Sequence, residues 1–432
     1  MIAQNLHSLK VEKSNLTLTS FAGLPLLTEL AQHCGVVRLL DALPGLWRRS
    51  GIYKTSDYVM ALALSLIGGG ETLDDIRLLR SDEGLAQLSL PDIPAANSVG
   101  DFLRRFGHKT IYRLSEIVTR QALLNVKAGQ TLTLDIDSSL IEAQKEQAKM
   151  TYAKFTGYNP LLAWIAEADV FIAGLFRDGN SSPQSHILRL LNYCRQKISP
   201  DNQLRFRSDS AGYQLAIMEY CHRNGVDFTI SADLDVSVRD VIANIPGKDW
   251  RLVVYGHDVF LMAETVHAPG SGSKQQLPAF RLIVTRKLSG QLELFEDVFR
   301  HRAIITNLPP SWSAEAVLVH HNARGNVEKA IAELKNGFAL HKLPCGELMA
   351  NAAYCQVCLL AYNLVRTLKN HALPDTWRNC CVKNLRYRLL CRAAVVVRHA
   401  RRLILRLPSD FAFFDVFERA RWAVLSPELS VT

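Results

Sequence analysis

The chain has 432 residues, 48% of them hydrophobic and 21% charged, which is the composition of a globular protein with a large buried core. This length exceeds what one core usually holds, so we expect two to four domains, and no run reaches the roughly 18 uninterrupted apolar residues that span a bilayer. A formal charge of +9 and a pI near 9.1 favour a polyanionic partner.

Nine cysteines at irregular spacing indicate free thiols in a reducing compartment. The first residues have no basic flank leading into an apolar core, so a secretory signal is not expected. The sequence therefore predicts a cytoplasmic protein with no membrane partner.

The first 125 residues are predicted to be helical. Residues 24–40 and 56–67 carry apolar side chains at helical spacing. Short basic helices joined by Gly-containing turns are compatible with DNA binding, although many helical domains without that activity share the pattern.

From Thr131 onward, strand patterns alternate with helix patterns. Strands are expected at 131–137, 161–176, 204–209 and 226–231, and helices at 187–198 and 213–223. This order predicts a mixed sheet with helices packed on its faces.

Residues 233–297 interrupt that alternation. Strand-like runs are found at 250–255, 259–266, 279–286 and 292–295. The Gly/Ser-rich loop between them lacks the Gly-Lys-Ser/Thr ending of a phosphate-binding loop, so it is expected to connect a hairpin. The segment is therefore interpreted as a β-rich insertion.

The chain from Pro344 is predicted to be mainly apolar helix ending in a basic stretch. Between Arg378 and Arg406 there are nine Lys or Arg residues and no Asp or Glu. Such a patch could follow a phosphate backbone, or it could be a solvated basic face. Within it, the residues expected to contact DNA are Arg398, Arg401 and Arg402.

Three carboxylates stand at the ends of predicted elements. Asp137 ends the first strand, Asp209 ends a later one, and Glu328 lies on the predicted helix that follows the insertion. Carboxylates placed in this way can converge and offer hard oxygen ligands to two Mg²⁺ or Mn²⁺ ions about 4 Å apart. Each aspartate could instead serve only to form a turn. Asp135 is a rival to Asp137, because strand alternation sends both side chains to one face; we favour Asp137, which is nearer the strand end.

The helix around Glu328 carries further polar residues at helical spacing. His321, Arg324, Glu328 and Lys335 are three, four and seven residues apart, which places them on one helical face. The cations suit phosphate oxygens and the carboxylate suits a metal ion. An exposed amphipathic helix with ordinary ion pairs is the alternative.

These residues resemble those of a known family. Arg324, Glu328 and Lys335 match the Y-x2-R-x3-E-x6-K signature of bacterial insertion-sequence DDE transposases with a ribonuclease H-like catalytic domain. Residues 134–139 and 204–213 are similar to that group's two aspartate motifs, and 177–180 to its Arg-x-Gly-Asn turn. The sequence departs from the signature in one place, where His321 replaces Tyr; its charge varies near neutral pH.

The resemblance implies cut-and-paste DNA transposition by two-metal phosphoryl transfer. Asp137, Asp209 and Glu328 would be the catalytic and metal-binding residues, while Arg324, Lys335 and His321 would contact phosphate. The partners would be double-stranded DNA, as terminal inverted repeats and as target, with a dimer in the synaptic complex at the bacterial nucleoid. Related enzymes hold a flipped base on an aromatic side chain; Trp250 is a candidate, and a buried core Trp is the other interpretation.

The expected fold is α/β, with a ribonuclease H-like core, a β-rich insertion and helical flanks. The expected domains are a helical DNA-binding domain at 1–125, the catalytic core at 126–232 and 298–343, the insertion at 233–297, and a helical, basic region at 344–432. Two alternatives to transposition stay open: a ribonuclease H-like nuclease without strand transfer, and a catalytically silent DNA-binding protein descended from a transposase.

Overall fold

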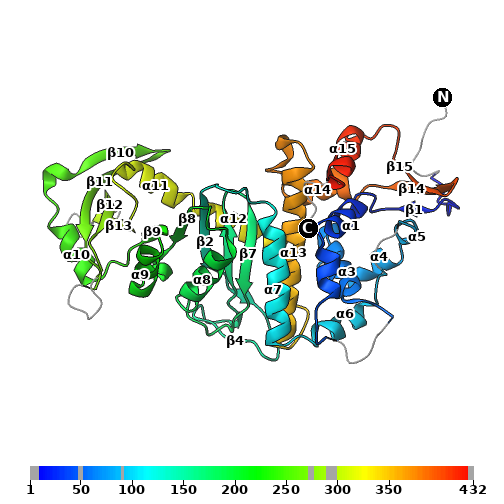
Figure 1. Ribbon diagram of the computed structural model, residues 1–432, viewed down its shortest axis with the longest axis horizontal. Helices are drawn as coiled ribbons and strands as arrows, with labels where there is room; N and C mark the ends of the chain where they lie inside the picture. Colours follow the sequence, from blue (N-terminus) through cyan, green and yellow to red (C-terminus); the bar gives the residue numbers. More distant parts are fainter. Residues whose placement is uncertain (1–8, 47–51, 89–91, 271–276, 289–298, 427–432) are drawn as a thin grey trace.

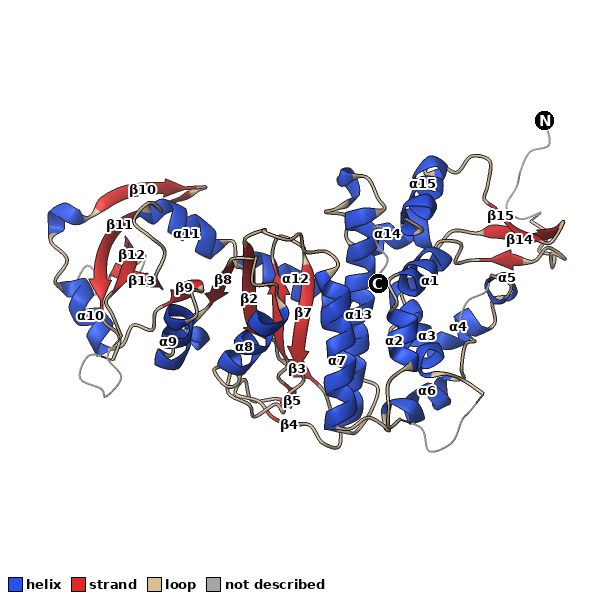
Figure 2. Cartoon of the chain, in the orientation of Figure 1, coloured by secondary structure: helices blue, strands red, loops and turns tan. Residues whose placement is uncertain are grey.

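The computed structural model describes residues 9–46, 52–88, 92–270, 277–288 and 299–426. The molecule is elongated, with a large sheet on the left of Figure 1 and a helical body on the right. In Figure 2 the strands of the large sheet lie in the left half of the view, and a small three-stranded sheet of β1, β14 and β15 lies at the far end of the helical body.

The large sheet has nine strands in the order β10-β11-β12-β13-β9-β8-β2-β6-β7. Their bounds are β2 Leu132–Ser138, β6 Leu161–Ile165, β7 Val170–Leu175, β8 Leu204–Ser208, β9 Asp227–Ser231, β10 Arg251–Tyr255, β11 Asp258–His267, β12 Phe280–Leu288 and β13 Phe299–Thr306. Strands β2, β8 and β9 run parallel. On the other side of β2, strand β6 is antiparallel to β2, and β7 is antiparallel to β6. The mixed sheet predicted from the sequence is confirmed, and so are its strands at 131–137, 204–209 and 226–231.

Helices pack on this sheet because packing removes their apolar faces from water. Helix α8 (Ile187–Lys197) contacts β6 and β7, α9 (Leu215–Arg223) contacts β9, and α12 (Gly325–Gly337) contacts β2. Side chains of the strands and of α8 and α9 form one hydrophobic cluster, which includes Leu134, Phe206 and Ile230. The alternation of strand and helix after Thr131 therefore produces the layers that it predicts.

The β-rich segment extends the same sheet. Strand β12 pairs with β13, and β13 pairs with β9, so β10 to β12 lie in register with the central strands. Helices α10 (Val236–Ala243) and α11 (Ala314–Asn322) lie beside these strands (Figure 1). The strand-like run at 292–295 falls outside the described residues.

Helix α13 (Leu348–His371) is the centre of the helical body. It contacts α1 (Leu24–His33), α3 (Thr55–Gly68), α6 (Ala96–Leu103) and α7 (His108–Leu123). By length and composition α13 could cross a membrane, but 89% of its apolar window is buried inside the protein, as expected of a core helix. The N-terminal helices and the segment after residue 344 therefore share one core.

Buried amides on α13 form hydrogen bonds with β7, the strand at the edge of the large sheet. Asn363 donates to the Phe171 carbonyl (2.8 Å) and accepts from the Phe171 N–H (2.9 Å), and Gln356 donates to the Gly174 carbonyl (2.9 Å). Strand β7 is the last strand of the sheet, so without these amides its buried backbone groups would lack partners. This contact joins the helical body to the sheet.

The C-terminal region differs from its predicted helical structure. After α13 come the short α14 (Val382–Leu385), two strands, β14 (Ala394–His399) and β15 (Arg402–Arg406), and α15 (Phe414–Val424). Strand β14 also pairs with β1 (Leu18–Thr19) near the N-terminus. Three consecutive valines, 395–397, explain the difference, because β-branched side chains favour strands.

Replacing Asn363 by Leu should destabilise the protein by about 2–4 kcal/mol, because two buried backbone groups of Phe171 lose their partners. Urea unfolding would measure the change. The neighbouring Leu364→Met, which keeps apolar volume, should cost less than about 1.5 kcal/mol. Equal losses in the two variants would show that packing, not the amide, matters at this position.

Candidate active site

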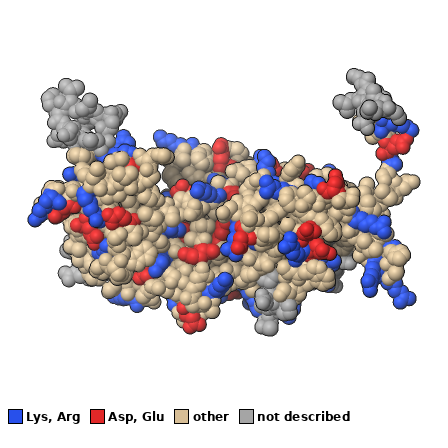
Figure 3. All heavy atoms as spheres, turned by 90° about the horizontal axis from the view of Figure 1, so that it is seen from above, with Lys and Arg blue, Asp and Glu red and all other residues tan. Residues whose placement is uncertain are grey.

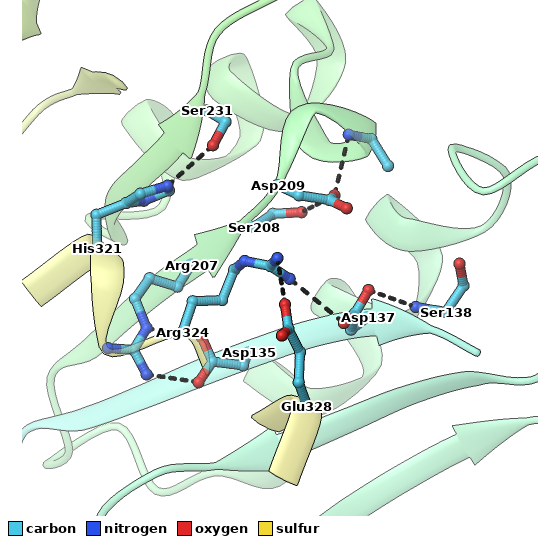
Figure 4. Close-up of polar contacts among 11 residues, drawn as sticks. Asp135, Asp137, Ser138, Arg207, Ser208, Asp209, Ser231, His321, Arg324 and Glu328 are labelled. Atoms are coloured by element: carbon cyan, nitrogen blue, oxygen red, sulfur yellow. Dashed lines mark hydrogen bonds and ion pairs between the residues drawn. The ribbon is translucent and has the colours of Figure 1, made fainter. Parts of the chain in front are cut away.

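Two strand ends and one helix bring Asp137, Asp209 and Glu328 together (Figure 4). Strands β2 and β8 are parallel neighbours, so Asp137 at the end of β2 and Asp209 just after β8 lie at one edge of the sheet. Helix α12 packs on β2 and carries Glu328 in its first turn. The predicted convergence of strand-end and helix carboxylates is visible in this arrangement.

A tight turn holds Asp209. Its carboxylate accepts from the Ala211 N–H at 3.0 Å and begins a short 3₁₀ turn, Ser210–Gly212. A Cβ at Gly212 would lie 2.5 Å from the Ser208 hydroxyl oxygen, so only glycine allows this close approach. The Asp-Ser-Ala-Gly sequence thus sets the position of the carboxylate.

Arg324 bridges the other two carboxylates. Its Nη1 lies 3.3 Å from Asp137 Oδ2, and its Nη2 lies 2.8 Å from Glu328 Oε1. Both Arg324 and Asp137 are largely buried. The guanidinium therefore supplies the positive charge that clustered carboxylates require.

The carboxyl of Asp137 has a perturbed acidity. Burial is the main reason that its pKa is raised to about 6; the charges of Asp209 and Glu328 act in the same direction, whereas Arg324 and the Ser138 N–H oppose the rise. The effect of Asp209 and Glu328 on Asp137 is consistent with the convergence of the three carboxylates in Figure 4. Metal binding would favour the ionised carboxylate.

The donor chemistry of this cluster fits a hard divalent ion, since all three side chains offer carboxylate oxygens. Within the described part of the chain, however, no group of three or more His, Cys, Asp or Glu side chains is already arranged to hold a metal. Arg324 accounts for this difference, because its guanidinium occupies oxygens of Asp137 and Glu328. Loading the cluster would require Arg324 to release them.

Asp135 has a different environment from Asp137. Arg207 on the neighbouring strand β8 binds it through two contacts, Nε to Oδ1 at 2.7 Å and Nη2 to Oδ2 at 2.5 Å. Both side chains are almost fully buried, and Arg207 Nη1 also donates to the His320 carbonyl. This pairing assigns Asp135 a structural role and favours Asp137 as the ligand.

The helix predicted to carry the signature is interrupted. Helix α11 ends at Asn322 and α12 begins at Gly325, so His321 and Glu328 lie on separate helices, which corrects the expectation of one helical face. Gly325 at the junction weakens helix continuity. The break turns His321 toward β9, away from the carboxylates (Figure 4).

His321 lies inside the protein, with only 5% of its surface exposed. Nε2 lies 2.9 Å from the Ser231 hydroxyl and Nδ1 lies 3.3 Å from the Thr229 hydroxyl. Burial, assisted by the charges of Arg324 and Arg207, lowers its pKa to about 3, so the ring is neutral. This placement favours a role in anchoring α11 to β9 over the expected contact with phosphate.

Lys335 is also engaged within the protein. Its ammonium donates to the Ser139 hydroxyl (2.9 Å) and to the Leu140 carbonyl (2.7 Å), and burial lowers its pKa. These contacts fix the segment that follows Asp137. If Lys335 also contacts a phosphate, its ammonium must do so while it donates to Ser139 and Leu140.

A basic groove in the insertion was not anticipated from the sequence. A cavity of about 1620 Å³ is lined by Arg239, Arg286, Arg300 and Arg302 and reaches Asn322 beside the carboxylates' helix. Strand alternation in Arg300-His-Arg302 places both arginines on one face, a signal that the sequence contained. Trp250 lines the cavity too, but the Arg286 guanidinium lies 3.9 Å from its ring centre, so one face of the indole is already covered.

Arg398, Arg401 and Arg402 lie on and between β14 and β15, at the opposite end of the molecule from the insertion (Figure 1). The structure therefore brings Asp137, Asp209, Glu328 and Arg324 together, with Lys335 beside them. It does not bring the C-terminal arginines to this site.

Removing Arg207 should be costly, because Asp135 would be left buried without its partner. Arg207→Met is expected to lower the free energy of unfolding by about 3–5 kcal/mol in urea, whereas Asp135→Leu combined with Arg207→Met should recover most of the loss. A double variant as unstable as Arg207→Met would refute the ion pair as the cause.

The buried His321 should make the protein sensitive to acid. Its folded pKa lies below the unfolded value near 6.5, so its contribution is complete above pH 6.5 and declines as pH falls toward 3, by at most about 1.4 kcal/mol per pH unit. Melting temperatures of wild type and His321→Gln from pH 7.5 to 5 should show a weaker pH dependence in the variant. Exposed His108→Gln serves as the control and should behave like wild type.

Comparisons with known proteins concern the chain as a whole. Residues 3–426 match the model of the family described as transposase DDE domain group 1. No curated protein matches the chain. Among solved structures, the piggyBac transposase synaptic complex with hairpin DNA aligns with a TM-score of 0.43 and 11% identity, covering 86% of this chain and 80% of that one. Because the family model spans nearly the whole chain, this protein belongs to the DDE transposase family, domain group 1.

Proposed function

We propose that this transposase cuts DNA at the ends of an insertion sequence and joins the freed 3′-hydroxyls to target DNA, as cut-and-paste transposition requires. The observation that carries the proposal is the convergence of Asp137, Asp209 and Glu328 from two parallel strand ends and a helix. The strand order β7-β6-β2-β8-β9, with three parallel central strands, supports a ribonuclease H-like core.

The three carboxylates would hold two Mg²⁺ or Mn²⁺ ions. When bound, such ions supply activation of the attacking oxygen and charge neutralisation at the leaving oxygen. Asp137 must be ionised for this role, and Arg324 must leave Asp137 and Glu328. The released guanidinium would then be close to the reacting phosphate, where its planar donors suit bidentate contact.

The remaining residues of the site position these groups. Lys335 fixes the segment after β2 through Ser139 and Leu140, and Asp135 with Arg207 fixes β2 against β8. Phosphoryl transfer depends mainly on such positioning and on charge stabilisation. The basic groove of the insertion would receive the DNA strand beside the carboxylates.

The proposed partners are double-stranded DNA, as element ends and target, and a second copy in the synaptic complex. The proposed domains keep the sequence boundaries: 1–125 for DNA binding, 126–232 with 298–343 for catalysis, 233–297 as the insertion and 344–432 as the C-terminal region. The proposed location is the cytoplasm, at the nucleoid.

A catalytically silent DNA-binding protein is the second candidate. One observation favours it: Arg324 already neutralises two of the three carboxylates. A permanent ion pair of this kind would keep metal out. The two candidates therefore differ in whether divalent ions bind to the cluster.

The decisive measurement uses linear DNA carrying the element's ends with Mg²⁺, Mn²⁺ or EDTA. Wild type should cleave at the element boundary only with metal, and Glu328→Gln and Asp209→Asn should lose at least about a hundredfold in rate while retaining DNA affinity. Glu315→Gln on the preceding helix α11 is the matched control and should cleave normally.

A second measurement tests metal binding without depending on DNA cleavage. Mn²⁺ should raise the melting temperature of wild type and of Glu315→Gln but not that of Glu328→Gln, because a ligand stabilises the state that binds it. DNA binding without cleavage, together with no thermal response to Mn²⁺ in wild type, would favour the silent protein.

A further inference from the structure

An exposed basic feature among the described residues is the two-stranded ribbon formed by β14 and β15. Strand β1 pairs with Ala394 and Val395, and the Thr17 carbonyl accepts from the Val396 N–H, so the ribbon from Val397 onward extends past this pairing. Its base is anchored, because Val396 is buried and Leu405 packs against the main core. From Arg398 to Leu403 every residue is exposed.

The exposed half of the ribbon carries charge of one sign. Arg398, His399, Arg401 and Arg402 stand within five residues, and no acidic residue lies between Arg378 and Arg406. Among the residues that the structure describes, none of the three guanidinium groups has an ion-pair partner. In Figure 3, Lys and Arg gather at the end of the molecule where the ribbon lies.

The turn at the tip is strained. Ala400 and Arg401 join β14 to β15 with φ of +48° and +63°, and two positive values define a type I′ turn. Such turns strongly favour Asn-Gly, because side chains with a Cβ are disfavoured there. An arginine held in this conformation at an exposed tip indicates that its position serves binding.

Protection of the sheet edge explains the charges only in part. Strand β15 is an edge strand, and charged residues on such a strand prevent pairing with other chains. That requirement accounts for Arg402 and Arg406. Beyond β1 the other side of β14 is also an unpaired edge, so the requirement covers Arg398 as well, but it does not account for Arg401 in the turn.

We propose that this ribbon enters the major groove of double-stranded DNA, with Arg398 and Arg402 on phosphates and Arg401 at base edges. The inference rests on the proposed DNA-directed function. A two-stranded ribbon fits the major groove, and arginine reads guanine there through O6 and N7. Arg398 and His399 alternate along β14, and Arg402 lies opposite His399, so cations occupy both faces of the ribbon and can reach both walls of the groove.

The position of the ribbon determines which base pairs it reads. The catalytic carboxylates lie near the large sheet, whereas the ribbon lies at the other end of the elongated molecule (Figure 1). The contacted base pairs are therefore distant from the cleavage position. The ribbon thus recognises an internal part of the element end.

The test for the phosphate contacts is the salt dependence of affinity for duplex DNA carrying the element end. Arg398→Gln combined with Arg402→Gln should reduce the slope of log affinity against log salt by about two units. The control, Arg189→Gln combined with Arg223→Gln, removes two exposed cations from α8 and α9 and should leave the slope unchanged. An unchanged slope in the ribbon variant overturns the proposal.

Arg401→Gly tests base reading without risk to the fold, because glycine accepts the positive φ. The melting temperature should stay equal or rise, while discrimination between the element end and scrambled DNA should fall roughly tenfold. Interference by methylation at guanine N7 should disappear at one site in this variant. Retained discrimination overturns the assigned role of Arg401.

Two further outcomes separate this inference from the catalytic one. If ribbon variants change the oligomeric state while the salt slope stays constant, the ribbon is a protein interface and the proposal fails. If wild type shows the expected slope and interference but never cleaves with metal, the catalytic function fails and the ribbon assignment stands.

Discussion

The buried ion pair between Asp135 and Arg207 is the interaction on which the site's geometry depends. It joins β2 to β8 at nearly full burial, and the same guanidinium donates to the His320 carbonyl at the end of α11. Asp137 lies near the end of β2 and Asp209 just after β8, while Arg324 and Glu328 follow α11. One arginine therefore sets the relative positions of all three elements. An apolar pair could pack as well there, but it could not hold the carbonyl of α11 in place.

The cluster near this ion pair shows how a protein tolerates carboxylates that repel one another. Burial and like charge raise the pKa of Asp137, which means that its ionised form is held at a cost in free energy. Arg324 lowers this cost from within the chain. If divalent ions bind as proposed, they replace the guanidinium, so the exchange couples metal loading to the release of an arginine toward phosphate. In a catalytically silent DNA-binding protein the cluster would be the same, but Arg324 would stay on the carboxylates and divalent ions would not replace it.

The sequence was informative where local pattern and chemistry coincide. Strand alternation ending in Asp137 and Asp209 located both residues, because parallel strands end at one sheet edge. The sequence favoured Asp137 over Asp135 only because Asp137 is nearer the strand end; the structure adds a physical distinction, since Arg207 binds Asp135. The helix break before Gly325 escaped prediction, because spacing alone describes a continuous helix. The ribbon at 394–406 was likewise missed: valines 395–397 favour a strand, but the pairing with β1 joins segments about 375 residues apart, which the local sequence does not reveal.

Long-range contacts of the same kind connect the segments that the sequence distinguishes. The insertion shares the large sheet through β13 and β9, and the N-terminal helices share a core with α13. The amides of Asn363 and Gln356 then join that helix to the sheet edge at β7. Hydrogen-bonded strands thus run without a break from the insertion to the helical body, and they include β8 and β2, at whose ends the two aspartates lie. Such continuity transmits position, because packed interiors and paired strands deform little. A duplex bound at the ribbon and at the basic groove would consequently be held at a fixed distance from Asp137, and the elongated shape of the protein would set which base pairs lie at the cutting position.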